Sequence, residues 1–204
     1  FLYIVNSYCK TSNEFKVYNE KENTGFLKHI IVRNNEKNEV MIVIVINKKS
    51  QYRLLTKVLE KLYDENNEVK SVYISIKNES NNVILGEEIR HVFGEKYLEE
   101  EIEGIKFKIY PDSFFQINKN QTVKLYKKAI EYLGESKDKT IIDAFSGTGT
   151  IAMILSKDAK KVIGIESVES SVVSGNFTIK ENNLNNVLLL NGKVETFLPN
   201  ILKK

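Results

Sequence analysis

A glycine-rich segment and an acidic residue downstream of it are the parts of the sequence best suited to binding a ligand. The segment, Asp143–Thr150, reads DAFSGTGT. Its glycines, Gly147 and Gly149, permit a sharp turn and let a ligand approach the backbone. Glu166 stands 17 residues beyond Gly149, where a carboxylate can accept hydrogen bonds from both hydroxyls of an adenosine ribose. The spacing predicts a site for an adenosine-containing cofactor.

Two cofactors are compatible with this loop. Gly147, Gly149 and Ala152 match the G-x-G-x-x-A fingerprint of dinucleotide-binding enzymes, and Glu166 lies near the distance that this fingerprint requires. Asp143 favours S-adenosylmethionine instead, because a pyrophosphate is anionic whereas S-adenosylmethionine carries an ammonium and a sulfonium. A structural glycine turn with an exposed glutamate is the third interpretation.

Strands and helices alternate around the loop. A helical pattern over 118–133 stops at Gly134. After it the sequence predicts strands at 140–144, 161–165 and 187–190, with helices at 151–156 and about 168–182. Alternation of this kind predicts parallel strands with right-handed crossovers. We therefore expect residues 118–204 to form the first three strands of a doubly wound α/β domain, which three strands do not complete.

The residues before Pro111 predict a different architecture. Apolar runs at 26–33 and 39–46 flank a polar loop and predict a hairpin, and residues 53–63 have a helical stripe. Further strands are expected at 72–76, 83–85, 97–102 and 105–109, the last two joined by a tight turn at Glu103-Gly104. The pattern predicts a small α+β domain with an antiparallel sheet, and we place it at residues 1–117.

Composition excludes several classes of protein. Hydrophobic residues make up 42% and charged residues 28% of the 204 residues, and no apolar run approaches the roughly 20 residues that span a bilayer. Without a signal peptide, a cytoplasmic protein is expected. Cys9 is the single cysteine, and His29 and His91 are far apart in the sequence. These residues therefore lack the spacing that metal ligands usually have. The net charge of +3 permits nucleic-acid binding without arguing for it.

Two motifs resemble those of a known family. The first, SFFQIN at 113–118 followed by Gln121, Leu125 and Tyr126, resembles the S-F-x-Q-x-N-x-x-Q-x-x-x-L-Y signature of the RNA uracil-C5 methyltransferases. The second, D-x-F-x-G-x-G from Asp143, resembles the first motif of class I methyltransferases. Matches at 25–33, 40–45 and 82–86 keep the family's order and spacing, so the resemblance covers most of the chain past residue 15.

The resemblance implies S-adenosyl-L-methionine as cofactor and a Rossmann-like fold for the second domain. The resemblance implies that Gln116 contacts the methionine end of the cofactor, because its side-chain amide can both donate and accept hydrogen bonds. Phe145 would pack against the cofactor, and Glu166 would hold the ribose. Thr150 occupies a position where relatives often have Asn. With Asp143, Gly147 and Gly149, these residues form the expected cofactor site.

RNA is the implied partner, with ribosomal RNA favoured over transfer RNA and no obligate protein partner. One of Phe114 and Phe115 would line a pocket for a flipped base, although without the resemblance both would be core residues. Arg33 and Lys28 either meet RNA phosphate or form solvated surface, and the residues alone do not decide.

The catalytic groups of the family fall outside this sequence. In the family a cysteine thiolate adds to C6 of uracil, so that C5 can take the methyl group, and a base then removes the C5 proton. Both groups lie well downstream of the glycine loop, beyond the position of Lys204. Cys9 is expected to be a structural helix residue, so no catalytic residue is assigned.

The sequence therefore resembles an internal fragment of an RNA methyltransferase. Its first residue is Phe1 rather than Met, and the isolated chain is expected to be inactive. Two alternatives stay open: a non-catalytic module that binds the cofactor or RNA, and, disfavoured by Asp143 and Gln116, a fragment of a nicotinamide-dependent oxidoreductase.

Overall fold

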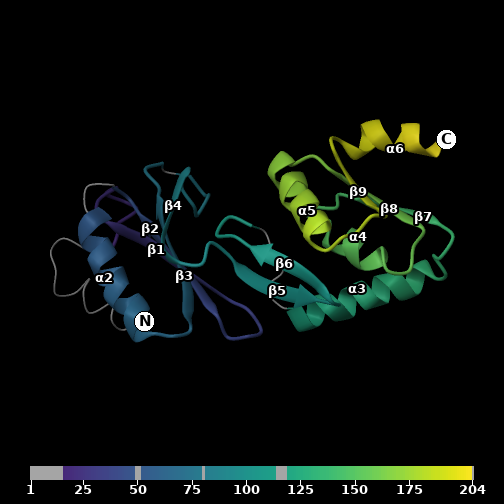
Figure 1. Ribbon diagram of the computed structural model, residues 1–204. Coiled ribbons are helices and arrows are strands. Elements are labelled where there is room, and N and C mark those ends of the chain that lie inside the picture. The colour runs from purple at the N-terminus through teal and green to yellow at the C-terminus, as the bar shows by residue number, and fades with distance from the viewer. Residues whose placement is uncertain (1–15, 49–51, 80, 114–118, 204) are drawn as a thin grey trace. The chain divides into compact units, whose positions relative to one another are not determined.

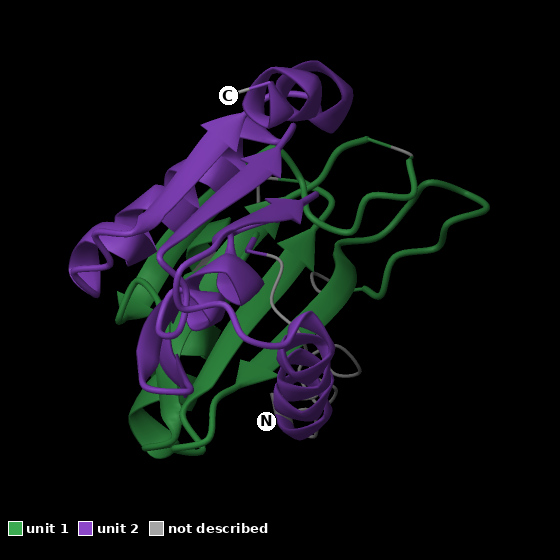
Figure 2. Ribbon diagram, turned by 90° about the vertical axis from the view of Figure 1, so that its right-hand side faces the viewer, with its two compact units in different colours: residues 1–98, 109–112 green, residues 99–108, 113–204 purple. Residues whose placement is uncertain are grey.

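The computed structural model describes residues 16–48, 52–79, 81–113 and 119–203. The chain divides into two compact units, shown in Figure 2: residues 1–98 with 109–112, and residues 99–108 with 113–204. The helix expected at the N-terminus with Cys9, and the motif residues Phe114, Phe115 and Gln116, lie outside the described residues.

In the residues that the structure describes, the first unit is a four-stranded sheet with one helix (Figure 1). The expected hairpin is present, since β1 (Leu27–Asn34) and β2 (Val40–Ile46) pair antiparallel. A helix, α2 (Tyr52–Glu65), leads to β3 (Val69–Ile76), which lies beside β2. The last strand, β4 (Glu88–Gly94), pairs antiparallel with β3. The strand order is β1-β2-β3-β4.

The sheet of the first unit is mixed, which corrects the expectation of an antiparallel sheet. Its outer pairs are antiparallel, but β2 and β3 are parallel. Parallel neighbours need a crossover connection, and α2 supplies it. Alternate residues of β2 and β3 form one core with α2, which includes Ile42, Ile44, Leu59, Leu62 and Ile74.

The prediction of a strand at residues 83–85 is wrong. Val83 and Ile84 lie in an irregular segment and are 61% and 52% exposed. The N–H of Gly86 donates to Ser75 Oγ at 2.8 Å, which holds this segment against the carboxyl end of β3. The fourth strand is β4 instead, and its polar residues concealed it from a search for apolar runs.

The second unit contains the parallel sheet that the alternation of elements predicts. Its strands are β7 (Thr140–Ala144), β8 (Lys161–Glu166) and β9 (Val187–Asn191), all parallel and in that order. Two helices, α4 (Thr150–Leu155) and α5 (Glu169–Glu181), connect them. Both pack on one face of the sheet.

Two further helices belong to this unit. The expected helix is α3 (Lys119–Leu133), and Gly134 follows it with a φ of 69°. A second helix, α6 (Val194–Leu202), was not expected, because Pro199 lies inside it. It covers the face of the sheet opposite to α4 and α5, where Val194 packs with Ile163 and Ile165. None of the helices in the described ranges is both long and apolar enough to cross a membrane.

The hairpin of β5 (Leu98–Ile102) and β6 (Ile105–Ile109) turns where expected. Glu103 and Gly104 have φ values of 50° and 73°, as a two-residue turn of type I′ requires. The apolar side chains of the hairpin share a core with α3 and α4, comprising Ile102, Ile105, Phe107, Tyr126, Met153 and Ile154.

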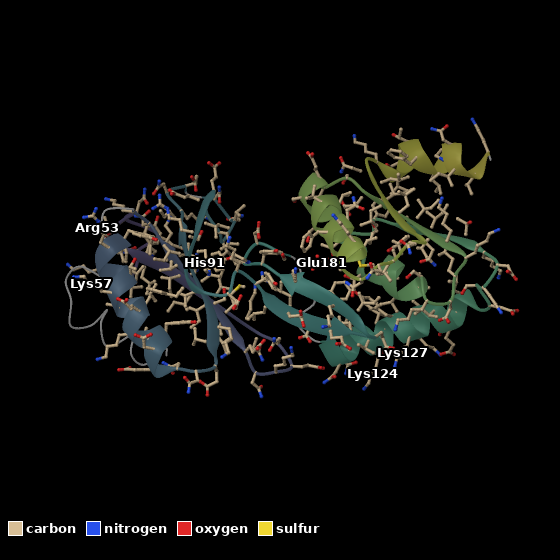
Figure 3. The ribbon with its side chains drawn as sticks, in the orientation of Figure 1. Arg53, Lys57, His91, Lys124, Lys127 and Glu181 are labelled. Atoms are coloured by element: carbon tan, nitrogen blue, oxygen red, sulfur yellow. The ribbon has the colours of Figure 1, made fainter. Side chains whose placement is uncertain are left out.

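Polar contacts also attach this hairpin to α5. The side chain of Asn182 accepts from the N–H of Lys106 at 2.9 Å and donates to its carbonyl at 2.8 Å. Lys108 pairs with Glu181, labelled in Figure 3, at 2.8 Å. Residues 99–108 therefore group with the second unit, whereas we expected them in the first domain. The domain boundary at 117/118 stays a prediction.

Candidate functional site

The site is built by the loop at the carboxyl end of β7. The Ser146 N–H donates to the carbonyl of Ile165 on β8 at 3.0 Å, and the Gly149 N–H donates back to the Ser146 carbonyl at 2.8 Å. The loop is thereby tied to the neighbouring strand before α4 begins. Gly147 and Gly149 have φ values of 56° and 79°, which glycine adopts without steric penalty.

Phe145 is the unusual residue of this loop. Its φ is 61°, a left-handed conformation that is unfavourable for a bulky side chain. Its ring is 73% exposed although it is apolar. Strained residues of this kind occur preferentially at ligand sites, so the exposed ring makes this loop a candidate ligand surface.

The loop lies close above the sheet because glycines make room for it. A Cβ on Gly149 would stand 2.9 Å from the Leu189 side chain, and a Cβ on Gly175 would stand 2.5 Å from the carbonyl oxygen of Thr148. A Cβ on Gly164 would overlap Leu189 as well. Leu189 therefore fills the space directly beneath the loop. A Cβ on Gly147, by contrast, would meet no atom within 4 Å, so the loop is open on that side.

A cavity of about 200 Å³ lies next to the loop. Its walls come from the loop itself, from α3, from the start of α4 and from the hairpin: Ile102, Thr122, Tyr126, Asp143, Phe145, Ser146, Gly147, Thr148, Thr150 and Ile151. The expected site residues Asp143, Phe145, Gly147 and Thr150 are therefore brought together. Gly149 lies below them, against Leu189.

Asp143 supplies a carboxylate to the cavity. Its Oδ2 accepts from the N–H of Ala152, in the first turn of α4, at 3.2 Å. Burial raises the pKa of Asp143 to about 6, although that hydrogen bond opposes the rise. Burial, and next the charge of Asp143, raises the pKa of Tyr126 in the same wall. A cation in this cavity would favour the charged form of Asp143.

Glu166 holds the loop from the end of β8. Its Oε2 accepts from the Gly147 N–H at 2.9 Å, and its Oε1 accepts from the Val168 N–H at 2.8 Å and from Ser167 Oγ at 3.2 Å. The hydrogen bond from Val168 is the main cause that lowers the pKa of Glu166. Partial burial acts in the opposite direction, and the hydrogen bond from Gly147 lowers the pKa further. The carboxylate is thus charged at neutral pH and fixed beside the loop.

Several residues of the site were missed by sequence reasoning. Ser146 lines the cavity, and its Oγ is buried without a hydrogen-bond partner among the described residues. Thr122 and Tyr126 reach the cavity from successive turns of α3, although Tyr126 reads as part of an apolar stripe. Gly164 and Gly175 interrupt a strand and a helix, and this is the signal that identifies close backbone approach.

Arg33 and Lys28, the basic residues considered for RNA phosphate, lie in the first unit. Arg33 Nη2 donates to the carbonyl of Pro111 at 3.1 Å, and burial lowers its pKa while Asp112 opposes that effect. Its guanidinium therefore ties β1 to the end of the first unit. Lys28 lines a separate cavity.

Residues 37–203 match the family described as tRNA (Uracil-5-)-methyltransferase. The chain is 42% identical over 190 residues to an uncharacterized RNA methyltransferase of Fusobacterium nucleatum, and 35% identical over 188 residues to one of Clostridium tetani. These alignments cover 93% and 92% of this chain, and 41% of each relative.

Solved structures agree with this grouping. The tRNA (uracil-54, C5)-methyltransferase of Pyrococcus abyssi, in complex with S-adenosyl-L-homocysteine, matches with a TM-score of 0.74 and 25% identity, over 94% of this chain and 45% of that chain. The tRNA m1G37 methyltransferase of M. jannaschii matches with a TM-score of 0.52 and 15% identity, over 92% and 51% of the two chains, and shows the fold alone.

Proposed function

Since the chain belongs to the tRNA (uracil-5-)-methyltransferase family, we propose that its second unit binds S-adenosyl-L-methionine and that the whole protein methylates C5 of uridine in RNA. The chain spans 41% of the length of the relatives above, and the activity is proposed for the whole protein. The observation that carries the proposal is the pair of carboxylates, Asp143 and Glu166, fixed on either side of an open glycine loop.

The residues present fit this cofactor. The Oε2 atom of Glu166 accepts one hydrogen bond, from the Gly147 N–H, and a carboxylate oxygen has a second lone pair with which it can accept a ribose hydroxyl. Asp143 would attract the ammonium or sulfonium. Phe145 offers an exposed ring beside the cavity, and Thr150 offers a hydroxyl within its wall. Gln116 stays a proposed partner of the methionine end.

A nicotinamide cofactor fits the same loop less well. Its pyrophosphate would lie at the glycines, beside the carboxylate of Asp143, and like charges in a partly buried site repel strongly. In its charged form, Asp143 accordingly favours a cationic ligand.

The cofactor supplies a methyl group bonded to a sulfonium. The residues of this chain would bind and orient that group, with Glu166 and Asp143 fixing its two polar ends. Uracil C5 also needs a thiolate on C6 and a base, which the family resemblance places beyond Lys204. We propose accordingly that this 204-residue chain binds the cofactor and does not methylate RNA by itself, and the appearance of 5-methyluridine in a reaction with this chain alone would overturn that.

The RNA substrate is the open part of the proposal. The sequence favours ribosomal RNA, whereas the description of the family and the Pyrococcus abyssi relative both name tRNA. Incubation of the full-length protein with 23S rRNA and with tRNA transcripts, followed by nucleoside analysis, distinguishes the two. Both RNAs are cytoplasmic, and we propose the same location for the protein.

The cofactor site is tested by calorimetric titration of this chain with S-adenosylhomocysteine, with NAD as the comparison ligand. Saturable binding of S-adenosylhomocysteine alone is expected. Glu166→Ala removes the charged hydrogen-bond acceptor for the ribose and should weaken binding by roughly 10- to 100-fold. Glu169→Ala, in the exposed first turn of α5, is the matched control and should bind normally. Binding of NAD, or equal affinity in both variants, would contradict the proposed site.

A further inference from the structure

A second cavity, polar in character, lies within the first unit. Its volume is about 270 Å³, and its lining includes Tyr18, Lys28, His29, Lys77 and Asn81. Lys28 and His29 come from the start of β1, and Lys77 directly follows the end of β3. Nothing in the proposed cofactor chemistry uses this cavity.

Lys77 is the key residue because its charge is buried. The residue is 3% exposed, and its Nζ donates to the carbonyl of Asn81 at 2.9 Å. Within the described part of the chain this is the one hydrogen bond of the Lys77 ammonium, which forms no ion pair there. An ammonium carries three N–H donors, and a buried charge without a counter-ion is unfavourable. Two of the three N–H donors of Lys77 therefore have no protein acceptor among the described residues and are suited to an anion.

Lys28 brings a second ammonium to the same cavity. Its Nζ lies 4.4 Å from the centroid of the Tyr18 ring and donates to the carbonyl of Glu79 at 3.3 Å. Burial lowers the pKa of Lys28, and the charge of Lys77 is the next cause. The two cations therefore repel each other across the cavity, and a bound anion would relieve both effects.

Two carboxylates, Glu20 and Glu79, also line the cavity and partly offset its positive charge. Both residues are exposed, and water and salt screen exposed charges strongly while screening buried ones much less. Each has a smaller effect on the pKa of Lys28 than Lys77 has. The lining of the cavity therefore combines the buried Lys77 and the half-buried Lys28 with two exposed carboxylates.

We propose that this cavity binds a backbone phosphate of the RNA substrate, with Lys28 and Lys77 neutralising its charge. Charged N–H donors are strong partners for phosphate oxygens, and contacts of this kind position a nucleic acid without reading its sequence. That the ligand is RNA follows from the proposed function, and the phosphate site rests on it in this respect. Lys28 and Lys77 would act as positioning residues, because they lie in a different unit from the cofactor cavity.

The test measures the affinity of this chain for a fluorescein-labelled, uridine-containing single-stranded RNA by anisotropy, over a series of salt concentrations. Lys28→Gln and Lys77→Gln should each weaken binding about 3- to 10-fold. Each should also reduce the slope of log K against log salt by roughly 0.7, the contribution of one phosphate contact in a single strand. Lys57→Gln is the matched control, since Figure 3 shows Lys57 on α2, pointing away from the sheet, and it should bind like the wild type.

Circular dichroism checks that each variant is folded. If the Lys77→Gln variant does not fold, because the side chain of Lys77 is buried, the result for Lys28→Gln decides the test. Unchanged affinity and salt slope in Lys28→Gln would overturn the proposal, as would the absence of RNA binding by the wild-type chain. Inorganic phosphate is titrated separately, and binding of that ion without binding of RNA would also overturn it. Titration with S-adenosylhomocysteine should give the same affinity in all variants, so failure of the RNA site and failure of the cofactor site are distinguishable.

Discussion

At the scale of single residues, the site contains two carboxylates with opposite acid–base behaviour. Burial raises the pKa of Asp143 to about 6, whereas hydrogen bonds led by that from Val168 lower the pKa of Glu166. Environments that separate the pKa values of neighbouring groups usually separate their roles as well. Glu166 is suited to be a permanent acceptor, while Asp143 gains its charge most easily when a cation is bound.

Affinity for S-adenosylhomocysteine should therefore depend on pH. Asp143 is charged above its pKa of about 6, and protonation below that value removes the attraction for the ligand's ammonium. Binding should be full near neutral pH and roughly tenfold weaker near pH 5, as expected when a proton competes with the ligand. Calorimetric titration across this range measures the effect.

The control for this pH dependence is Asp143→Asn. It should bind weakly with little change over the same range, because the lowered pKa of Glu166 keeps that carboxylate charged. A wild-type affinity that stays constant down to pH 5 would show that Asp143 does not contact the ligand's ammonium.

The charged and glycine residues of the site were predictable because their chemistry is visible in the sequence. Asp143 and Glu166 follow apolar runs, and strands that end together bring their last residues to one edge. Ser146 and Thr122 were not predictable, since a hydroxyl carries no such signal until the fold places it in a cavity wall. Gln116 stays a prediction, because it lies outside the described residues.

At the scale of elements, the loop, β8, β9 and α5 meet at Leu189. Gly164 in β8 and Gly175 in α5 lack the Cβ atoms that would overlap this leucine. The helix and both strands can therefore approach the loop closely, and the height of the loop above the sheet depends on these glycines.

Gly175→Ala should destabilise the chain even though alanine favours helices. Its Cβ would meet the Thr148 carbonyl oxygen at 2.5 Å, and backbone cannot move aside as a flexible side chain can. We expect a loss of about 1–3 kcal/mol in the free energy of unfolding, measured by urea denaturation. Asn176→Ala, exposed on the same helix, should be neutral or slightly stabilising. Similar stability of the two alanine variants would mean that the loop shifts freely.

Elements whose apolar residues follow a regular, uninterrupted pattern could be predicted from the sequence, whereas the others could not. The parallel βαβ order and the hairpin of β1 and β2 follow from apolar runs separated by polar loops. The polar composition of β4 and Pro199 in α6 hid those two elements. The parallel pairing of β2 with β3 is a matter of topology, which periodicity does not encode.

At the scale of the whole molecule, each unit has a hydrophobic core of its own. The core of the first unit lies between its sheet and α2, and that of the second lies between its sheet, α4 and α5. The proposed cofactor site uses residues of the second unit only, and the proposed phosphate site uses residues of the first. Binding at each site should therefore stabilise its own unit first.

Hydrogen exchange measures this separation directly. S-adenosylhomocysteine at about 100 times its Kd adds roughly 2.7 kcal/mol to the stability of the state that binds it. Core amides of β8 should then exchange about 100-fold more slowly, while those of β2 keep their rates. Equal slowing in both sheets would show instead that the two units unfold as one.

The conformation of Phe145 has a kinetic consequence. Its ring is held outward by a backbone with a φ of 61°, and we expect the energetic penalty of that conformation to be met during folding. Ligand entry then needs no slow rearrangement of the loop, and the observed association rate should rise linearly with ligand concentration instead of reaching a plateau. With a preformed loop of this kind, further mutations should change the dissociation rate of the complex more than its association rate.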